Sequence, residues 1–260
     1  MKNRIKIILR LLSFVVKFFI SKNPSEKTKP QSYSTPQSRV EKIFYIPPHE
    51  KRMVFLDWGH GGINENGEYT TNGKLHKHKS GKFHDGSTFY EGVFNRIQVK
   101  NVAKRLIDKD IPFRFVADSV EDTSLEDRVN FANDVAKYLG KENCLYISFH
   151  ADAFNGHARG FSVYTSPGIT KSDKVAEELF KTISNKMGHL IRLRFDKSDG
   201  DHDKEAKFYV LTETSMSAIL IEHLFFDNYE DAKLLMSKQI QDLFAQCTAE
   251  VIEKWYRGLL

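Results

Sequence analysis

Three residues that can bind a metal ion or transfer a proton each follow an apolar run of strand-like composition. His60 lies just after MVFLDW, His150 ends CLYISFH, and Glu222 ends SAILIE. In open α/β sheets, ligands bind beyond the carboxyl ends of the strands, so these side chains are expected at one edge of a sheet. Small residues follow both histidines, which lets the backbone bend closely around a small ligand. Two imidazoles at neighbouring strand ends therefore predict a metal site.

The type and position of Glu91 make it the expected third ligand. Catalytic zinc often takes two histidines and one glutamate and leaves a fourth place for water. Glu91 begins the helical run EGVFNRIQVKNVAKRL, while Glu65 and Glu68 of the preceding polar insert remain alternatives. A further carboxylate beside the metal would accept a proton from water, whose pKa zinc lowers to about 7. The predicted site has one zinc ion, three ligands and one catalytic base: His60, Glu91 and His150 as ligands, and Glu222 as the base.

The polar insert between residues 61 and 90 carries three more histidines among its lysines, His76, His78 and His84. Histidines of a polar loop usually face solvent, so a second metal is the less favoured reading. A loop of this length in a compact domain is usually functional or forms a short hairpin. The insert is therefore expected to flank the site rather than to build a second one.

Two residues beside the predicted site have weaker assignments. His223 follows Glu222 and should point to the opposite side if the strand continues, because side chains alternate along a strand. Asp57 alternates away from Leu56 and is a candidate for orienting His60 through a hydrogen bond, as groups behind metal ligands often do.

Short apolar runs alternate with longer helical segments from Met53 onward. Helical periodicity and N-capping residues predict helices at 92–109, 124–139, 172–190 and 230–256. Strands are predicted at six runs, MVFLDW, PFRFVAD, CLYISFH, GFSVYT, KFYVL and SAILIEH. This alternation predicts a three-layer α/β/α sandwich with a central, mostly parallel twisted sheet.

The first 22 residues are apolar but interrupted by Lys6, Arg10 and Lys17, so no stretch is long enough to span a membrane. At helical spacing these cations form a stripe opposite a wide apolar face, which favours contact with an anionic membrane surface. A signal peptide or signal anchor, or a helix packed on the body, are the alternatives. Residues 23–42 have linker composition, which leaves 43–260 as the expected catalytic domain.

The positive charge of the chain is concentrated in this tail. The net charge is +5, and residues 1–42 hold ten Lys or Arg against two Glu, so the remaining residues sum to −3. A body that bound nucleic acid would need a basic face of its own, so nucleic acid is not an expected partner. The two cysteines, Cys144 and Cys247, lie in apolar runs and are expected to be buried free thiols.

The two histidine motifs resemble those of the zinc-dependent N-acetylmuramoyl-L-alanine amidases of the type 3 class. DWGHGG at 57–62 matches that family's D-x-G-H-G-G, and SFHAD at 148–152 matches its second histidine motif. Glu91 corresponds to the family's helix-opening glutamate, with Asn95 where the family often has asparagine. LEDRVNFAN at 125–133 and Arg159-Gly160 are softer matches.

The glutamate motif of the same family is E-x-G-F-x-x-N, and this chain has EHLFFDN at 222–228, with Leu224 in place of the glycine. The four motifs occur in the family's order, and the resemblance covers about residues 53–257. Residues 191–207 and the insert 63–90 differ from the family pattern. These departures bear on substrate preference, because both segments are expected to line the groove for the stem peptide.

The resemblance implies zinc-dependent hydrolysis of the amide bond between N-acetylmuramic acid and L-alanine in peptidoglycan. It implies His60, Glu91 and His150 as the zinc ligands and Glu222 as the catalytic residue. It also implies a place in the cell envelope, or in the cytoplasm before release if a phage encodes the chain. The alternatives are a zinc peptidase that cuts within the stem peptide and a non-catalytic, membrane-tethered wall-binding module.

Overall fold

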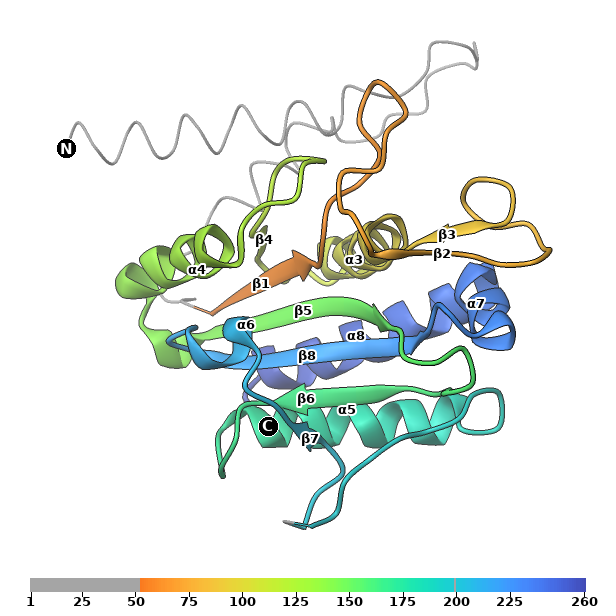
Figure 1. Cartoon of the computed structure of the whole chain (residues 1–260). Coiled ribbons are helices and arrows are strands. Elements are labelled where there is room, and N and C mark those ends of the chain that lie inside the picture. Colours follow the sequence, from red (N-terminus) through yellow and green to blue (C-terminus); the bar gives the residue numbers. More distant parts are fainter. Residues whose placement is uncertain (1–51, 199) are drawn as a thin grey trace, which may run out of the picture. The chain divides into compact units, whose positions relative to one another are not determined.

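A computed structural model describes residues 52–198 and 200–260 of the chain (Figure 1). The predictions for the tail at 1–22 and the linker at 23–42 therefore lie outside the described residues. Within the described part, none of the helices combines the length and the apolar character that crossing a bilayer requires.

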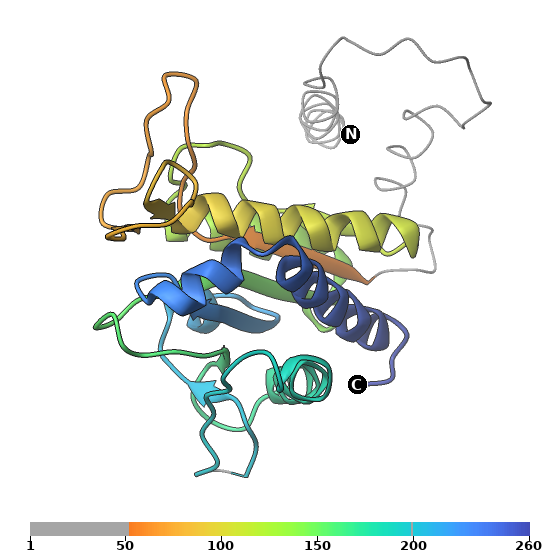
Figure 2. The ribbon, with the colours of Figure 1, turned by 90° about the vertical axis from the view of Figure 1, so that its right-hand side faces the viewer.

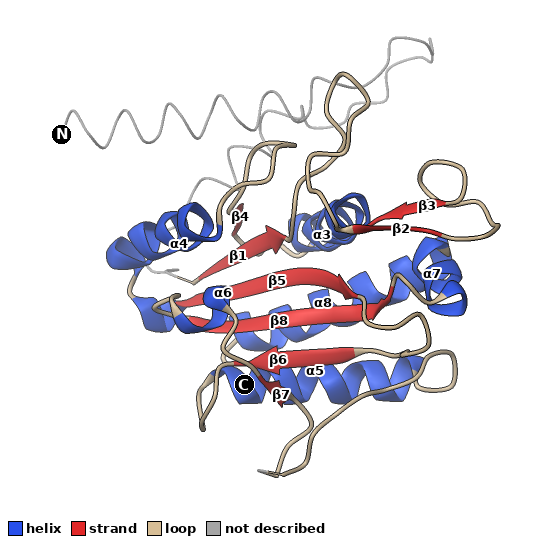
Figure 3. Cartoon of the chain, in the orientation of Figure 1, coloured by secondary structure: helices blue, strands red, loops and turns tan. Residues whose placement is uncertain are grey.

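The centre of the fold is a six-stranded sheet in the order β4-β1-β5-β8-β6-β7 (Figure 3). All neighbouring strands are parallel except β6 and β8, which are antiparallel. The central strands are apolar along their length because helices cover both faces of the sheet. The strands are β1 (Met53–Trp58), β4 (Phe113–Phe115), β5 (Cys144–Asp152), β6 (Ser162–Thr165), β7 (Lys204–Glu205) and β8 (Ser217–Phe225).

Helices pack on the two faces of the sheet and create two apolar cores. Val54 and Leu56 of β1 join the larger core under the first group of helices, whereas Met53 and Phe55 join the smaller core under the second group. The first group is α3 (Glu91–Asp108), α5 (Ser172–Met187), α7 (Tyr229–Met236) and α8 (Lys238–Tyr256) (Figure 2). The second is α4 (Leu125–Leu139) and α6 (Tyr209–Thr212). The predicted three-layer α/β/α sandwich is confirmed.

Local signals in the sequence are reproduced at several places. Ser124 caps α4, since its Oγ accepts a hydrogen bond from the Asp127 amide at 3.1 Å. A short 3-10 turn, η1 (Lys141–Asn143), joins α4 to β5. Cys144 and Cys247 are buried free thiols, as expected.

The run KFYVL at 207–211 was predicted as a strand, and this prediction is wrong, because the segment leads into the single-turn helix α6. Val210 and Leu211 are both buried in the smaller core. A strand would direct these adjacent side chains to opposite faces, whereas a helical turn lets both pack on one core.

The predicted helix 230–256 is divided at Ser237, which has an extended backbone with φ −70° and ψ 118°. The break lets Leu235 of α7 and Ile240 of α8 both reach the larger core. Gln241 Nε2 donates to the Leu235 carbonyl at 2.6 Å and so satisfies an acceptor at the end of α7.

The polar insert forms the hairpin of β2 (Leu75–Lys77) and β3 (Thr88–Tyr90), which pair antiparallel apart from the main sheet. β3 leads directly into α3 at Glu91. Two residues of the insert hold the start of that helix: the Lys74 carbonyl accepts from the Glu91 amide at 3.0 Å, and the Tyr69 hydroxyl accepts from the Gly92 amide at 2.9 Å. The insert therefore fixes where Glu91 lies.

Candidate active site

The carboxyl ends of β1, β5 and β8 lie at one edge of the sheet, where the β2–β3 hairpin and α7 also lie (Figure 1). The register pairs His150 of β5 with Glu222 of β8. His60 lies two residues beyond the end of β1, next to β5. The parallel sheet thus brings three residues from distant parts of the chain to one edge, as predicted from their positions after apolar runs.

Glu91 reaches the same place from the first turn of α3 and joins the two imidazoles. Its Oε1 lies 2.9 Å from His150 Nδ1 and 3.3 Å from His60 Nε2. The two rings are nearly perpendicular, with centroids 4.9 Å apart. One ligand atom from each of these three residues lies within 4.8 Å of the other two. Among the described residues, this is the one group of three or more such side chains close enough to hold a metal ion.

The Glu91 carboxylate is deeply buried, with 1% of the residue exposed, and its Oε2 accepts no hydrogen bond from the described residues. Lys74 Nζ is the nearest cation, 3.8 Å from that oxygen. Burial opposes ionisation, but hydrogen bonding and the positive charge of His150 and His60 lower the pKa of Glu91 overall. A buried carboxylate aimed at two imidazoles suits a cation between them, because a buried charge needs a partner.

His60 has a left-handed backbone, with φ 69°, which side chains other than glycine seldom adopt. Its carbonyl accepts hydrogen bonds from Arg96 Nη1 at 2.9 Å and Arg128 Nη2 at 3.4 Å. Gly59 leaves room for the second imidazole, since a Cβ there would lie 2.0 Å from His150 Cε1. The two arginines and the glycine allow the turn that points His60 toward Glu91.

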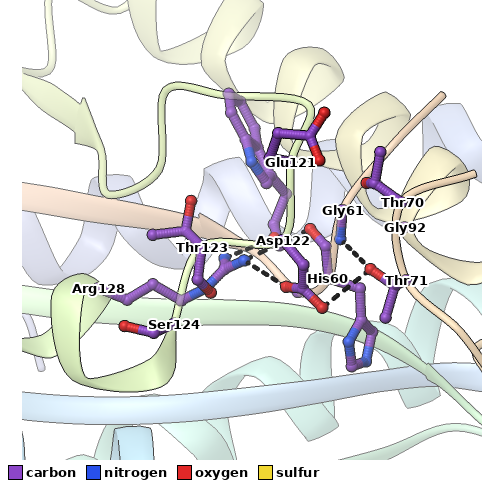
Figure 4. Close-up of polar contacts among 12 residues, drawn as sticks. His60, Gly61, Thr70, Thr71, Gly92, Glu121, Asp122, Thr123, Ser124 and Arg128 are labelled. Carbon is purple, nitrogen blue, oxygen red and sulfur yellow. Dashed lines mark hydrogen bonds and ion pairs between the residues drawn. The ribbon is translucent and has the colours of Figure 1, made fainter. Parts of the chain in front are cut away.

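Hydrogen bonds from the insert and from the segment before α4 stabilise the turn at His60 and Gly61 (Figure 4). Thr71 Oγ1 accepts from the Gly61 amide at 2.6 Å and donates to Asp122 Oδ2 at 2.9 Å. Asp122 in turn pairs with Arg128 at 3.3 Å. Sequence reasoning missed this network, although Arg128 lies within LEDRVNFAN, a motif already noted in the sequence.

Asp57 does not bond His60 directly in the described structure, unlike the arrangement expected from the sequence. Its Oδ1 accepts from Arg128 Nη1, and its Oδ2 accepts from Ser148 Oγ at 2.7 Å. Burial opposes ionisation, but the charge of Arg128 and the Ser148 hydrogen bond lower the pKa of Asp57. Asp57 therefore acts on His60 only through Arg128, which binds the carbonyls of Trp58 and His60.

Replacing Asp57 with asparagine should destabilise the fold by about 3–5 kcal/mol, because it leaves the Arg128 charge buried without its partner. The folded pKa of Asp57 is lowered, so its contribution is full above the unfolded value of about 3.9 and is lost as pH falls through the folded value. Urea unfolding at pH 7 and at acidic pH measures both effects.

The matched control is Asp134→Asn, which removes one partner of the exposed Lys137–Asp134 pair and should leave the stability nearly unchanged, because solvent screens exposed pairs. Equal stability of the Asp57→Asn variant and the unmodified chain would refute the importance of the buried pair.

Glu222 is partly buried opposite His150, and its Oε2 has no hydrogen-bond partner among the described residues. Burial, followed by the negative charges of Glu91 and Asp152, raises the pKa of Glu222 well above its ordinary value. A carboxyl with a raised pKa is a stronger base, which suits proton transfer at neutral pH. The pKa of Glu222 is therefore raised, as suits a base, whereas the pKa of Glu91 is lowered, as suits a metal ligand.

The remaining candidates lie outside the metal group. Glu65 and Glu68 are exposed in the insert. His78 Nε2 contacts the Phe226 carbonyl, and His84 Nδ1 accepts from the Tyr90 amide. His223 is buried on the face of the sheet that α3 and α8 cover, against Phe94 and Phe244. Its Nδ1 donates to the His150 carbonyl at 2.8 Å. Alternation along β8 therefore directs His223 away from the site, as expected.

A family model described as N-acetylmuramoyl-L-alanine amidase matches residues 54–254. The chain is 28% identical over 243 residues to N-acetylmuramoyl-L-alanine amidase AmiA of Escherichia coli (strain K12), covering 79% of this chain and 76% of that protein. It is 25% identical over 209 residues to the uncharacterized protein YqiI of Bacillus subtilis (strain 168), covering 80% of this chain and 87% of YqiI. The solved structure of N-acetylmuramoyl-L-alanine amidase AmiC2 of Nostoc punctiforme is similar with a TM-score of 0.59 and 25% identity, covering 80% of this chain and 98% of that one.

Proposed function

The chain belongs to the N-acetylmuramoyl-L-alanine amidase family and hydrolyses the amide bond between N-acetylmuramic acid and L-alanine in peptidoglycan, and from this premise we propose which residues perform the reaction. His60, Glu91 and His150 hold one zinc ion. Glu222 is the catalytic base. The substrate is peptidoglycan, so the protein works at the cell wall.

The observation that carries the zinc assignment is the convergence of three ligand atoms, one from each of His60, Glu91 and His150, within 4.8 Å. Glu91 Oε2 and His60 Nε2 are buried without hydrogen-bond partners among the described residues, and His60 Nε2 has only its 3.3 Å ion-pair approach to Glu91 Oε1, so a cation would satisfy both. Two imidazole nitrogens and one carboxylate form a donor set that catalytic zinc commonly uses. The residues present therefore fit this metal.

Zinc, when bound, supplies a Lewis acid that polarises the scissile carbonyl and makes water more acidic. Glu222 takes a proton from the attacking water at its carboxylate oxygen and returns it to the nitrogen of L-alanine as the amide bond breaks. Burial, followed by the negative charges of Glu91 and Asp152, raises the pKa of Glu222, which favours uptake of a proton by this carboxylate. Arg96 and Arg128 keep His60 in place while Glu222 moves the proton.

Digestion of purified cell walls tests the reaction. The chain should release free alanine amino termini without new reducing sugar ends, at a rate that a chelator abolishes and added zinc restores. Metal analysis should give one zinc ion per chain. New reducing ends alone would mean a glycosidase and would contradict the proposal.

The same digestion separates the alternatives. A peptidase that cuts within the stem peptide would release fragments whose masses lack L-alanine at the amino terminus. A wall-binding module without activity would bind walls, release nothing, and contain no stoichiometric zinc.

The tail adds a proposal about location. We infer that residues 1–22 hold the protein at an anionic membrane surface, from their basic stripe and wide apolar face. Sedimentation with anionic vesicles tests the contact: the full chain should sediment, and residues 43–260 alone should not.

A further inference from the structure

Arg194, in the segment 191–207, pairs with a carboxylate beside the active site. Arg194 Nη1 donates to Asp152 Oδ2 at 3.4 Å. Lys204, on the same segment, donates instead to the Tyr164 hydroxyl at 3.2 Å.

The Arg194 side chain is held in position yet open to solvent. Its backbone amide donates to the Phe161 carbonyl at 2.8 Å, which ties the segment to the start of β6. The guanidinium lies over the Phe225 ring, 4.7 Å from its centroid, and 36% of the side chain is exposed. A guanidinium has five N–H donors, and a single bond to Asp152 leaves others for a ligand.

Arg194 lies beyond His150 and Glu222, here called the catalytic pair, in the direction in which β5 and β8 run. Its partners Asp152 and Phe225 face each other in the register, two and three residues after His150 and Glu222. At about 3.3 Å per residue, that places them roughly 7–10 Å from the catalytic pair. The α-carbon of the residue after L-alanine lies about 3.8 Å beyond that of L-alanine, and its carboxylate extends to roughly 6–7 Å from the scissile nitrogen.

We propose that Arg194 binds the free α-carboxylate of the residue that follows L-alanine in the stem peptide. This inference rests on the proposed function and adds a substrate preference to it. The sugar strand offers no free carboxylate after the lactyl group is amidated, whereas the stem peptide does. Guanidinium recognises carboxylates with paired hydrogen bonds, and Lys74, the other nearby cation, already lies against Glu91.

Two synthetic substrates separate this subsite from a general attraction to peptides. Both are N-acetylmuramoyl tripeptides with an amidated carboxyl terminus, and they differ only in a carboxylate or a carboxamide on the α-carbon of the second residue. The released peptides of both kinds are titrated against the full-length protein by calorimetry, and both substrates are used for hydrolysis. The acidic peptide should bind about tenfold to a hundredfold more tightly, as expected for a charge-assisted hydrogen bond.

Arg194→Gln should remove this preference, and the rate on the amidated substrate should change little. The matched control is Arg192→Gln, because Arg192 is exposed on the same segment and lies two residues away. Equal binding of both peptides by the unmodified protein, or a preference that survives Arg194→Gln, would overturn the subsite. Preferential binding of the acidic peptide without hydrolysis of either substrate would uphold the subsite and contradict the proposed function.

Discussion

Replacing Glu222 with glutamine is expected to slow amide hydrolysis by about 10²–10⁴-fold while zinc stays bound at one ion per chain. Glutamine keeps the size of the side chain but cannot accept the proton of the attacking water. The three proposed ligands are untouched, because none of them bonds Glu222 in the described structure. Rates on a muropeptide and zinc content of the same preparation measure the two effects together.

The matched control for this substitution is Glu230→Gln. Glu230 is an exposed glutamate near the start of α7, paired with Lys233 at the surface. Its replacement should change neither the rate nor the zinc content. An unchanged rate in the Glu222→Gln protein would remove Glu222 from the mechanism, whereas lost zinc would mean that Glu222 helps to bind the metal.

Two carboxyl groups at one sheet edge have opposite pKa shifts, and this difference supports their separate roles. Imidazoles beside Glu91 outweigh burial and lower its pKa, whereas burial and the charge of Glu91 raise the pKa of Glu222. Environments that push paired carboxyl groups apart commonly divide the work between a charged group and a proton carrier. A bound cation would act on both groups, more strongly on Glu91 because the histidines surround it.

The position of the site could be predicted because strand ends in a parallel sheet meet at one edge. His60, His150 and Glu222 each follow an apolar run, and their types limit the chemistry. The sequence alone did not single out Glu91 as the third ligand, because the insert contains other acids. The folded structure distinguishes them, since it buries Glu91 and leaves Glu65 and Glu68 exposed.

The supporting residues were beyond prediction from the sequence. Arg96 and Arg128 donate to the His60 carbonyl from separate helices, and no spacing or motif around either arginine predicts this contact. The same holds for Arg194, whose partner Asp152 is 42 positions away in the chain. Such contacts depend on how the helices and loops close over the sheet edge, which local periodicity does not encode. The helix α6 was missed for a related reason, since a short apolar run fits a strand and a buried turn equally well.

Glu91→Gln is expected to reduce zinc affinity by at least about a hundredfold and to bring hydrolysis to background, since replacement of groups behind a metal ligand already costs 10- to 100-fold. A neutral amide between His60 and His150 offers no negative charge to the metal. Competition with a zinc-binding dye measures the affinity, and wall digestion measures the rate.

The control substitution is Glu68→Gln, which changes the alternative acid of the insert. Glu68 is exposed, and within the described part of the chain its side chain accepts from Asn64 and not from either histidine, so its replacement should leave zinc and activity intact. The reverse result, zinc lost with Glu68→Gln and kept with Glu91→Gln, would move the third ligand to the insert. That outcome would also require the insert to fold differently over the site, because Glu91 is the acid that the start of α3 directs between the two imidazoles.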